Sequence, residues 1–200
     1  MDIKKRIREV LDSEAAAIQA VNVGDDFVRA VEALGQCNGK VLTTGIGKAG
    51  IIARKMAATL CSTATPASFL HPAESAHGDL GLAATRDVMI AYSTSGKSAE
   101  VLETITLGRH LGIETVIGVT SHPDSDLRDL SDIVLDMGII EEPCSLNLTP
   151  SSSIAVMLAI SDAIAIALMD HKGVTRHDYG LRHHGGYLGR KARTDNIDED

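Results

Sequence analysis

The 200-residue sequence has no Trp, and its aromatic residues are limited to two Phe and three Tyr. So few rings argue against a protein that binds RNA or single-stranded DNA by stacking bases on aromatic side chains. Basic residues are also scarce, because 19 Lys and Arg stand against 27 Asp and Glu and give a net charge of −8. An acidic protein attracts a nucleic-acid backbone poorly, so we expect no nucleic-acid partner. A small anionic ligand is still compatible, because backbone N–H groups can bind a phosphate on an acidic protein.

Paired cysteines and a long uninterrupted apolar run are missing as well. The three cysteines are Cys37, Cys61 and Cys144. An odd set of thiols without paired spacing is typical of a reducing compartment. Charges recur too often near the amino terminus for a signal-peptide core. The longest apolar stretch, 154–169, is interrupted by polar residues and is shorter than the about 20 apolar residues that cross a bilayer. We therefore expect a cytoplasmic protein with no membrane partner.

The pattern of apolar residues predicts an α/β fold. Apolar residues at three- and four-residue spacings indicate helices over 2–21 and 25–34. Short β-rich runs then alternate with helix-like segments. The expected strands are 40–44, 67–70, 87–93, 114–120 and 132–135, and the expected helices after them are 51–61, 99–111, 126–130 and 152–169. Nearly continuous apolar strands that alternate with helices are typical of a parallel sheet covered on both faces, which is a three-layer sandwich.

The same pattern predicts how the chain is divided. We expect one domain over 1–192, with N-terminal helices over 1–39 and with the core and a C-terminal site segment over 40–192. The remaining residues, 193–200, form a short and strongly charged stretch, which predicts a disordered acidic tail.

Two segments at strand-to-helix junctions are candidates for binding an anion. Gly45-Ile-Gly-Lys-Ala-Gly50 matches the dinucleotide fingerprint Gly-x-Gly-x-x-Gly. The carboxylate that this fingerprint requires about 20 residues later is displaced to Glu74, and a Lys in the turn is unusual for it. The residues therefore leave three alternatives open: a dinucleotide site, a structural tight turn, and a turn that presents Lys48 to an anionic substrate.

The second segment, Ser93-Thr-Ser-Gly-Lys-Ser98, carries four hydroxyls around a Gly at the start of an expected helix. Hydroxyls and free backbone N–H groups at a helix N-terminus favour phosphate binding, assisted by the helix dipole. The alternative is N-capping by Ser98, but one hydroxyl is enough for a cap.

Three further segments carry groups suited to chemistry. The segment His71–Asp79 has two His and two carboxylates, which suit metal binding or acid–base work, although their spacing fits no strong zinc pattern. Ser151–Ser153 are N-cap candidates for the last expected helix. The segment 181–190 has paired His beside paired Gly, and from its residues alone we expect a solvated C-terminal loop.

Six segments match the motifs of one protein family in a fixed order. They are Thr44–Gly50, Arg54–Thr59, His71–Gly81, Ser93–Glu100, Glu142–Ser153 and His183–Lys191. Together they resemble the sugar isomerase (SIS) domain family, and within it the members that isomerise arabinose 5-phosphate. The sequence departs from the family's motifs at Ala49, Lys97, Ser145, Thr149 and His184. None of these departures removes a group that we expect to be catalytic. Many members carry two C-terminal CBS domains, and we expect this regulatory module to be missing here.

The resemblance implies a central five-stranded parallel sheet and an aldose–ketose isomerase. The implied reaction interconverts D-ribulose 5-phosphate and D-arabinose 5-phosphate, supplies Kdo synthesis and needs no cofactor. The implied catalytic residues are Lys48, Glu100, Glu142 and His183. The implied substrate- and phosphate-binding residues are Gly45, Gly47, Thr65, His77, Ser93, Ser95 and Ser98. His71 corresponds to a position linked in relatives to an inhibitory zinc ion. Members commonly form homotetramers with sites at subunit interfaces, so we expect His183 to reach a neighbouring subunit's site.

The carboxylates receive different expected roles in the proton transfer. Glu100 lies in the first turn of a helix, where the dipole should keep it ionised and weakly basic. Glu142 lies ahead of a buried apolar helix, where partial desolvation should raise its pKa toward the working range. We therefore expect Glu142 to be the base, Glu100 to orient or shuttle, and His183 to open the sugar ring.

Other functions remain alternatives. Another phosphosugar isomerase, such as 6-phospho-3-hexuloisomerase, would use the same groups. A non-catalytic SIS sensor of a sugar phosphate or of CMP-Kdo would be expected to have lost the acid–base residues, which this chain retains. A dinucleotide-dependent oxidoreductase is the third alternative, and titration with a nicotinamide cofactor would distinguish it.

Overall fold

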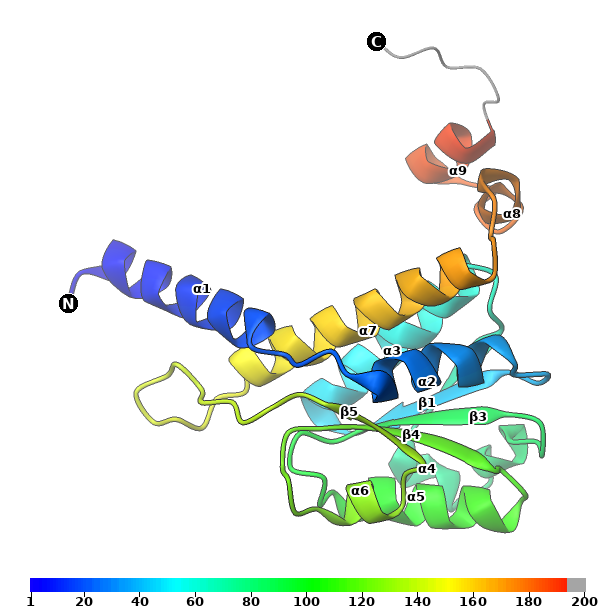
Figure 1. Ribbon diagram of the computed structural model, residues 1–200, viewed down its shortest axis with the longest axis horizontal. Coiled ribbons are helices and arrows are strands. Elements are labelled where there is room, and N and C mark those ends of the chain that lie inside the picture. Colours follow the sequence, from blue (N-terminus) through cyan, green and yellow to red (C-terminus); the bar gives the residue numbers. More distant parts are fainter. Residues whose placement is uncertain (194–200) are drawn as a thin grey trace.

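Figure 1 shows the computed structural model, which describes residues 1–193. Its helices are α1 (Ile3–Gln19), α2 (Asp25–Gly35), α3 (Gly47–Ser62), α4 (Pro72–Ser75), the 3₁₀ turn η1 (Asp79–Leu82), α5 (Ala99–His110), α6 (Asp126–Asp129), α7 (Ser152–His171), α8 (Arg176–Gly180) and α9 (Gly186–Arg193). Its strands are β1 (Val41–Gly45), β2 (Ala67–Leu70), β3 (Val88–Tyr92), β4 (Thr115–Thr120) and β5 (Ile133–Asp136).

The five strands form one parallel sheet in the order β2-β1-β3-β4-β5. The expected three-layer α/β fold with a central five-stranded parallel sheet is therefore confirmed. β1 and β3 lie inside the sheet, and all residues of both are buried, as their continuous apolar sequences predict. Successive side chains of a strand point to opposite faces, so each strand supplies two separate cores.

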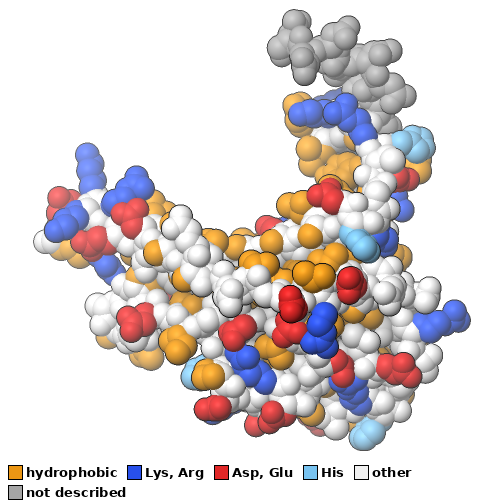
Figure 2. All heavy atoms as spheres, viewed as in Figure 1, with side chains coloured by type: hydrophobic (Ala, Val, Ile, Leu, Met, Phe, Trp, Pro, Cys, Tyr) orange, Lys and Arg blue, Asp and Glu red, His pale blue; other side chains and the backbone are white. Residues whose placement is uncertain are grey.

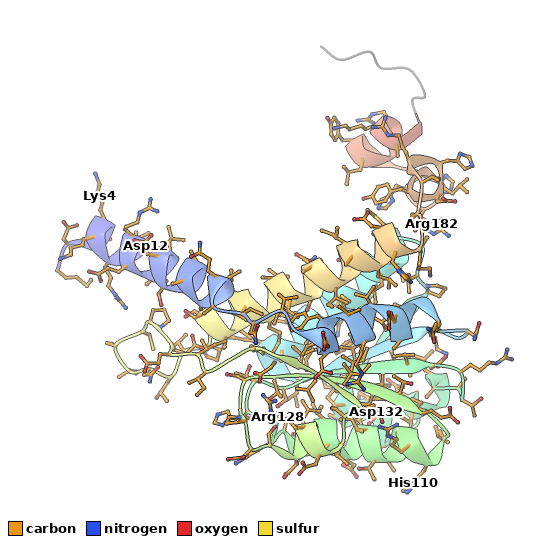
Figure 3. The ribbon with its side chains drawn as sticks, in the orientation of Figure 1. Lys4, Asp12, His110, Arg128, Asp132 and Arg182 are labelled. Carbon is orange, nitrogen blue, oxygen red and sulfur yellow. The ribbon has the colours of Figure 1, made fainter. Side chains whose placement is uncertain are left out.

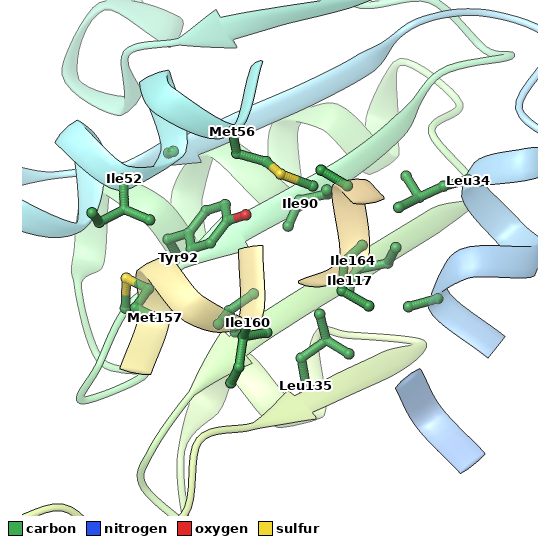
Figure 4. Close-up of a cluster of buried hydrophobic side chains, with 14 of the residues drawn as sticks. Leu34, Ile52, Met56, Ile90, Tyr92, Ile117, Leu135, Met157, Ile160 and Ile164 are labelled. Carbon is green, nitrogen blue, oxygen red and sulfur yellow. The ribbon is translucent and has the colours of Figure 1, made fainter. Parts of the chain in front are cut away.

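The larger core lies between the sheet and the helices α2, α3 and α7. In Figure 4, Ile90 and Tyr92 of β3 pack close to Met56 of α3 and Ile160 of α7. The smaller core lies on the opposite face, where Met89 of β3 packs with residues of α5 and α6. The layers are visible in Figure 1, with α2, α3 and α7 on one side of the sheet and α4, α5 and α6 on the other.

Helix α7 is long and apolar enough to cross a membrane by length and composition alone. However, half of the most apolar stretch of this helix is buried inside the protein. The helices α1, α2 and α3 all pack against it. This environment is that of a core helix, which is apolar on most sides because protein surrounds it.

Several boundaries and elements differ from the sequence-based expectations. The α3 helix begins at Gly47 rather than at residue 51, so the Gly-rich turn forms its first turn. The segment 181–190 was expected to be a solvated loop, which is wrong for its second half, because α9 begins at Gly186. The acidic tail predicted over 193–200 lies outside the described residues except for Arg193, which ends α9.

Two parts of the chain extend away from the sheet in Figure 1: α1 at one end, and α8 with α9 at the other. The α1 helix has no buried residue, and its apolar residues Ile3, Ile7 and Leu11 are about half exposed or more. Hydrophobic side chains gather on the surface between these two projections in Figure 2. A groove of about 560 Å³ lies between α1, α2 and α7.

Candidate functional site

The strand order reverses between β1 and β3, and this point lies beside the two predicted anion-binding segments. The chain leaves β1 toward β2 on one side, and β3 continues the sheet on the other side. Gly45, which ends β1, pairs in register with Tyr92 of β3, so the turns that follow the two strands are neighbours. In open α/β sheets, ligands bind outside the carboxyl ends of the strands at such a switch point. We therefore locate the candidate site there.

The turn after β3 brings serine hydroxyls together. The Oγ atoms of Ser93 and Ser98 are 3.0 Å apart, and the backbone N–H of Lys97 donates to Ser95 Oγ at 3.2 Å. Ser98 occupies the N-cap position of α5, but its side chain makes no capping hydrogen bond. The capping alternative is therefore wrong, and the Ser98 hydroxyl is directed to Ser93 instead.

The backbone of the same turn supplies further donors. Within residues 1–193, the N–H groups of Ser98, Ala99 and Glu100 have no hydrogen-bond acceptor. Unpaired N–H groups and the positive end of the helix dipole make a site for an anion. The observed geometry therefore fits the predicted phosphate-binding loop better than a capped helix start.

The turn after β1 has a second uncapped helix N-terminus. The N-cap residue of α3, Ile46, makes no side-chain capping bond, and Gly47 has a φ of +60°, which favours glycine. A Cβ on Gly50 would lie 2.5 Å from Gly45 O, so only glycine allows the helix to approach the strand this closely. Lys48 is exposed on this first turn and takes part in none of the salt bridges among the described residues.

The segment after β2 places two histidines at the same edge of the sheet. His71 follows β2 directly, and its buried Nδ1 atom has no hydrogen-bond partner among the described residues. His77 is exposed in the turn between α4 and η1. Residues 1–193 contain no group of three or more His, Cys, Asp and Glu side chains that could hold a metal ion. The zinc site implied at His71 therefore stays a prediction.

Glu142 has a different environment from the one predicted. Its carboxylate lies at the N-terminus of α7 and accepts hydrogen bonds from the backbone N–H groups of Ser151 at 2.8 Å, Ser152 at 2.9 Å and Ser153 at 3.3 Å. The hydroxyls of Ser151 and Ser153 donate to it as well. Glu142 therefore caps α7, whereas the serines were expected to do so.

The hydrogen bonds also reverse the expected change in acidity. Burial by itself raises the pKa of Glu142, but the hydrogen bonds from Ser153 and Ser151 outweigh it, and the net pKa is lowered. The expectation of a raised pKa is wrong, because desolvation was considered without the donors at the start of α7. A carboxylate held in this way is a weak base and a strong anchor for the loop that carries it.

Replacing Glu142 with Gln should lower the free energy of unfolding by about 1–2 kcal/mol at neutral pH, which is typical for a lost helix cap. The folded-state pKa lies below the unfolded value near 4.5. The contribution is therefore fully present above that value and is lost as the pH falls through the lower folded-state pKa. Urea unfolding of both proteins at about pH 7 and about pH 3 measures this difference.

Glu141→Gln is the matched control, because Glu141 is the exposed neighbour and its replacement changes the charge equally. It should unfold like the wild type. A Glu142→Gln protein as stable as the wild type at neutral pH would show that this carboxylate does not anchor α7.

The loop before α7 also holds a thiol that the sequence did not single out for reactivity. The backbone N–H groups of Leu148 and Thr149 each donate to Cys144 Sγ at 3.3 Å. These bonds, led by that of Thr149, lower the pKa of the Cys144 thiol to about 6. The signal lies in backbone geometry, so residue types alone could not reveal it.

Thr44 is another residue that was not assigned to the site. It precedes the Gly turn of β1, is fully buried, and its hydroxyl has no hydrogen-bond partner among the described residues. A buried polar atom without a partner is uncommon. Its position at the end of β1 makes it a further candidate contact for a ligand.

Two residues assigned by resemblance lie at the opposite edge of the sheet. Thr65 precedes β2, is buried, and accepts a hydrogen bond from Lys172 Nζ at 3.1 Å. His183 follows α8, stacks on Tyr179 with ring centres 4.0 Å apart, and lies 3.0 Å from Tyr179 O through Nδ1. In Figure 3, the labelled Arg128 of α6 lies near the carboxyl ends of the strands, whereas the labelled Arg182, which directly precedes His183 in the sequence, lies far from it. Within one chain, the structure does not bring Thr65 and His183 to the switch point.

These features define an α/β protein with a candidate anion site at the carboxyl ends of its strands. The sequence profile named SIS domain matches residues 34–167. The chain belongs to the SIS domain family, as its motifs indicated.

Relatives and solved structures agree with this assignment. The arabinose 5-phosphate isomerase KdsD of Pseudomonas aeruginosa is 44% identical over 181 residues, which are 90% of this chain and 55% of the relative. A Bacteroides fragilis protein with a proposed activity as a phosphosugar isomerase in capsule formation superposes with a TM-score of 0.90 at 39% identity, covering 92% of this chain and 99% of that one. An Escherichia coli CFT073 protein in complex with arabinose 5-phosphate gives a TM-score of 0.87 at 39% identity, covering 91% and 97%.

The chain spans 55% to 58% of the length of the curated KdsD proteins that it matches first. Those relatives therefore contain a large region with no counterpart in the 200 residues. The SIS domain match over residues 34–167 covers the turns after β1 and β3.

Proposed function

We propose that the protein is an aldose–ketose isomerase that interconverts D-arabinose 5-phosphate and D-ribulose 5-phosphate. The observation that carries the proposal is the pair of uncapped helix N-termini, α3 and α5, at the switch point of a fold whose 39% identical structural relative was solved with arabinose 5-phosphate. The N-terminus of α5 with Ser93, Ser95 and Ser98 would hold the phosphate. The N-terminus of α3 would bring Lys48 to the sugar.

The reaction moves two protons, and substrate and product contain the same atoms. In the direction from aldose to ketose, a base removes the proton from C2, an enediolate forms, and the protonated base delivers to C1 either that proton or one that it has exchanged with solvent. The hydroxyl proton of O2 moves to O1, and the carbonyl passes from C1 to C2. No cofactor is needed for these steps. Lys48 would stabilise the negative charge that develops on the enediolate oxygen.

We propose that Glu100, rather than Glu142, is the base that removes the carbon-bound proton. Both oxygens of Glu142 are engaged by donors at the start of α7, and its pKa is lowered. Glu100 is exposed in the first turn of α5, next to the proposed phosphate site. With the phosphate held at the start of α5, this carboxylate would face the carbons of the bound phosphosugar.

We further propose that the site is completed by another copy of the chain, in a homotetramer. Thr65 and His183 lie at the edge of the sheet opposite Lys48 and Glu100, so they can contact the same sugar only from a neighbouring subunit. There, His183 would transfer the proton that opens the sugar ring. The exposed apolar residues of α1 and the adjacent groove support such an assembly. We place the protein in the cytoplasm, where its product would enter Kdo synthesis.

A coupled isomerase assay over a panel of phosphosugars tests the proposal. The panel includes arabinose 5-phosphate, ribulose 5-phosphate, a hexulose 6-phosphate and the sugars without phosphate. Turnover of the pentose phosphates is the expected result. Turnover of the hexulose phosphate alone would identify a different phosphosugar isomerase, and binding without turnover would identify a sensor.

Replacing Ser95 or Ser98 with Ala should chiefly raise KM. Each hydroxyl would bond a phosphate that stays bound throughout the reaction, so its removal weakens substrate and transition state equally. The loss of one hydrogen bond to a charged group costs about 1.5–3 kcal/mol. Steady-state kinetics of both variants measure the effect, and a normal KM with a collapsed kcat would place the loop in the chemistry instead.

A further inference from the structure

Lys97 lies within the proposed phosphate loop, between Gly96 and Ser98. It is exposed, and it takes part in none of the salt bridges among residues 1–193. Its backbone N–H donates to Ser95 Oγ, which engages one lone pair of that hydroxyl and leaves its proton able to donate. Lys97 therefore shapes the loop through its backbone, and its ammonium has no partner in the described chain.

The loop holds the backbone of Lys97 in a fixed place. Gly96 has a φ of +65°, and a Cβ there would lie 2.3 Å from Ser125 Oγ. The backbone N–H of Leu127 donates to Gly96 O at 3.0 Å, and that of Ser121 donates to Thr94 O at 3.1 Å. These contacts tie the loop to α6 and to the segment between β4 and α6. Only the flexible stem of Lys97 remains free, and a four-carbon stem can carry the ammonium over the adjacent anion site.

The ammonium of Lys97 can reduce the electrostatic repulsion between the protein and a phosphate ester. The chain carries a net charge of −8, so its overall field repels a phosphate ester. Glu100 adds a carboxylate to the same helix N-terminus that would receive the phosphate. A cation beside the cradle offsets both effects, because interactions between charges a few ångströms apart outweigh those beyond the screening length.

We propose that Lys97 is a phosphate-recognition residue, whose ammonium pairs with the phosphate of the bound phosphosugar and raises the affinity for doubly charged esters. The role rests on the proposed function, because it places the substrate's phosphate in the loop from Ser93 to Ser98. It adds a specificity-determining side chain to a cradle otherwise built from hydroxyls and backbone N–H groups. The pair is solvent-exposed, so its strength depends on salt.

The test uses inorganic phosphate as the probe and needs no turnover. Calorimetric titration should show its Kd rising about two- to fivefold in Lys97→Gln, which is the range for an exposed ion pair. In Lys97→Glu, where attraction becomes repulsion, the rise should be about tenfold. Raising the salt from about 0.05 M to about 0.5 M should reduce the difference from the wild type. The KM for arabinose 5-phosphate should rise in parallel while kcat stays within about twofold.

Lys4→Gln and Lys4→Glu are matched controls, because they change the net charge equally at an exposed residue of α1 that is far from the loop (Figure 3). They should bind phosphate like the wild type. Equal phosphate affinity in Lys97→Glu and Lys4→Glu would overturn the role of Lys97. A protein that isomerises no pentose phosphate but loses phosphate affinity only in the Lys97 variants would contradict the proposed function and still support Lys97.

Discussion

Replacing Glu100 with Gln should stop the exchange of the substrate's carbon-bound proton with solvent deuterium. The amide keeps the size and hydrogen-bonding shape of the side chain but cannot take up the proton from C2. A positioned acid–base group contributes about 10²- to 10⁴-fold to a rate, so kcat should fall by about that factor. Proton NMR of the phosphosugar in deuterium oxide measures the exchange directly, and phosphate affinity should change little.

Two variants make this result specific. Glu103→Gln removes the same charge from an exposed position one turn further along α5, and it should exchange protons at the wild-type rate. Glu142→Gln should lose stability but keep exchange, because we assign that carboxylate to the loop before α7. Exchange that survives in Glu100→Gln and disappears in Glu142→Gln would return the base role to Glu142.

The fold was predictable because its signals are local and repeated. Each buried strand is a short apolar run, and the Gly and Ser residues that end β1 and β3 mark where strands become helices. Parallel strands place the turns after their carboxyl ends on one edge of the sheet. This rule predicts that the turns after β1 and β3, which carry Lys48 and Ser93, are neighbours, and the register of Gly45 with Tyr92 confirms it. The binding roles of the residues in these turns stay predictions.

The missed features depend on contacts that residue types do not encode. The acidity of Glu142 depends on donors nine to eleven residues later, which meet it only because α7 begins there. The short helix α8 did carry a local signal, since Thr175 and Asp178 form a reciprocal capping box. The Gly pair after His183 suggested a loop, whereas Gly186, with a φ of +71°, begins α9. Thr65 precedes the expected strand 67–70, so the same rule for parallel strands places it at the edge opposite Lys48, as the structure shows.

Replacing Lys48 with Met should lower kcat/KM by about 10²- to 10³-fold, the loss that follows removal of one group that stabilises a developing oxyanion. Met retains most of the length and apolar character of the Lys stem, so the first turn of α3 should keep its packing. The negative charge on the enediolate oxygen exists only along the reaction path. The loss should therefore fall mainly on kcat and less on KM.

Lys55→Met provides the matched substitution on the same helix. Lys55 pairs with Asp162 on the surface, and exposed ion pairs contribute about 1 kcal/mol or less to stability, so this variant should retain wild-type kinetics. Lys48→Arg should recover part of the lost rate, because it restores the charge with a different shape. If Lys48→Met unfolds by circular dichroism while Lys55→Met does not, Lys48 supports the turn instead of the reaction. A folded Lys48→Met protein with full activity would show that Lys48 does not stabilise the enediolate, and that the N–H groups at the start of α3 do so instead.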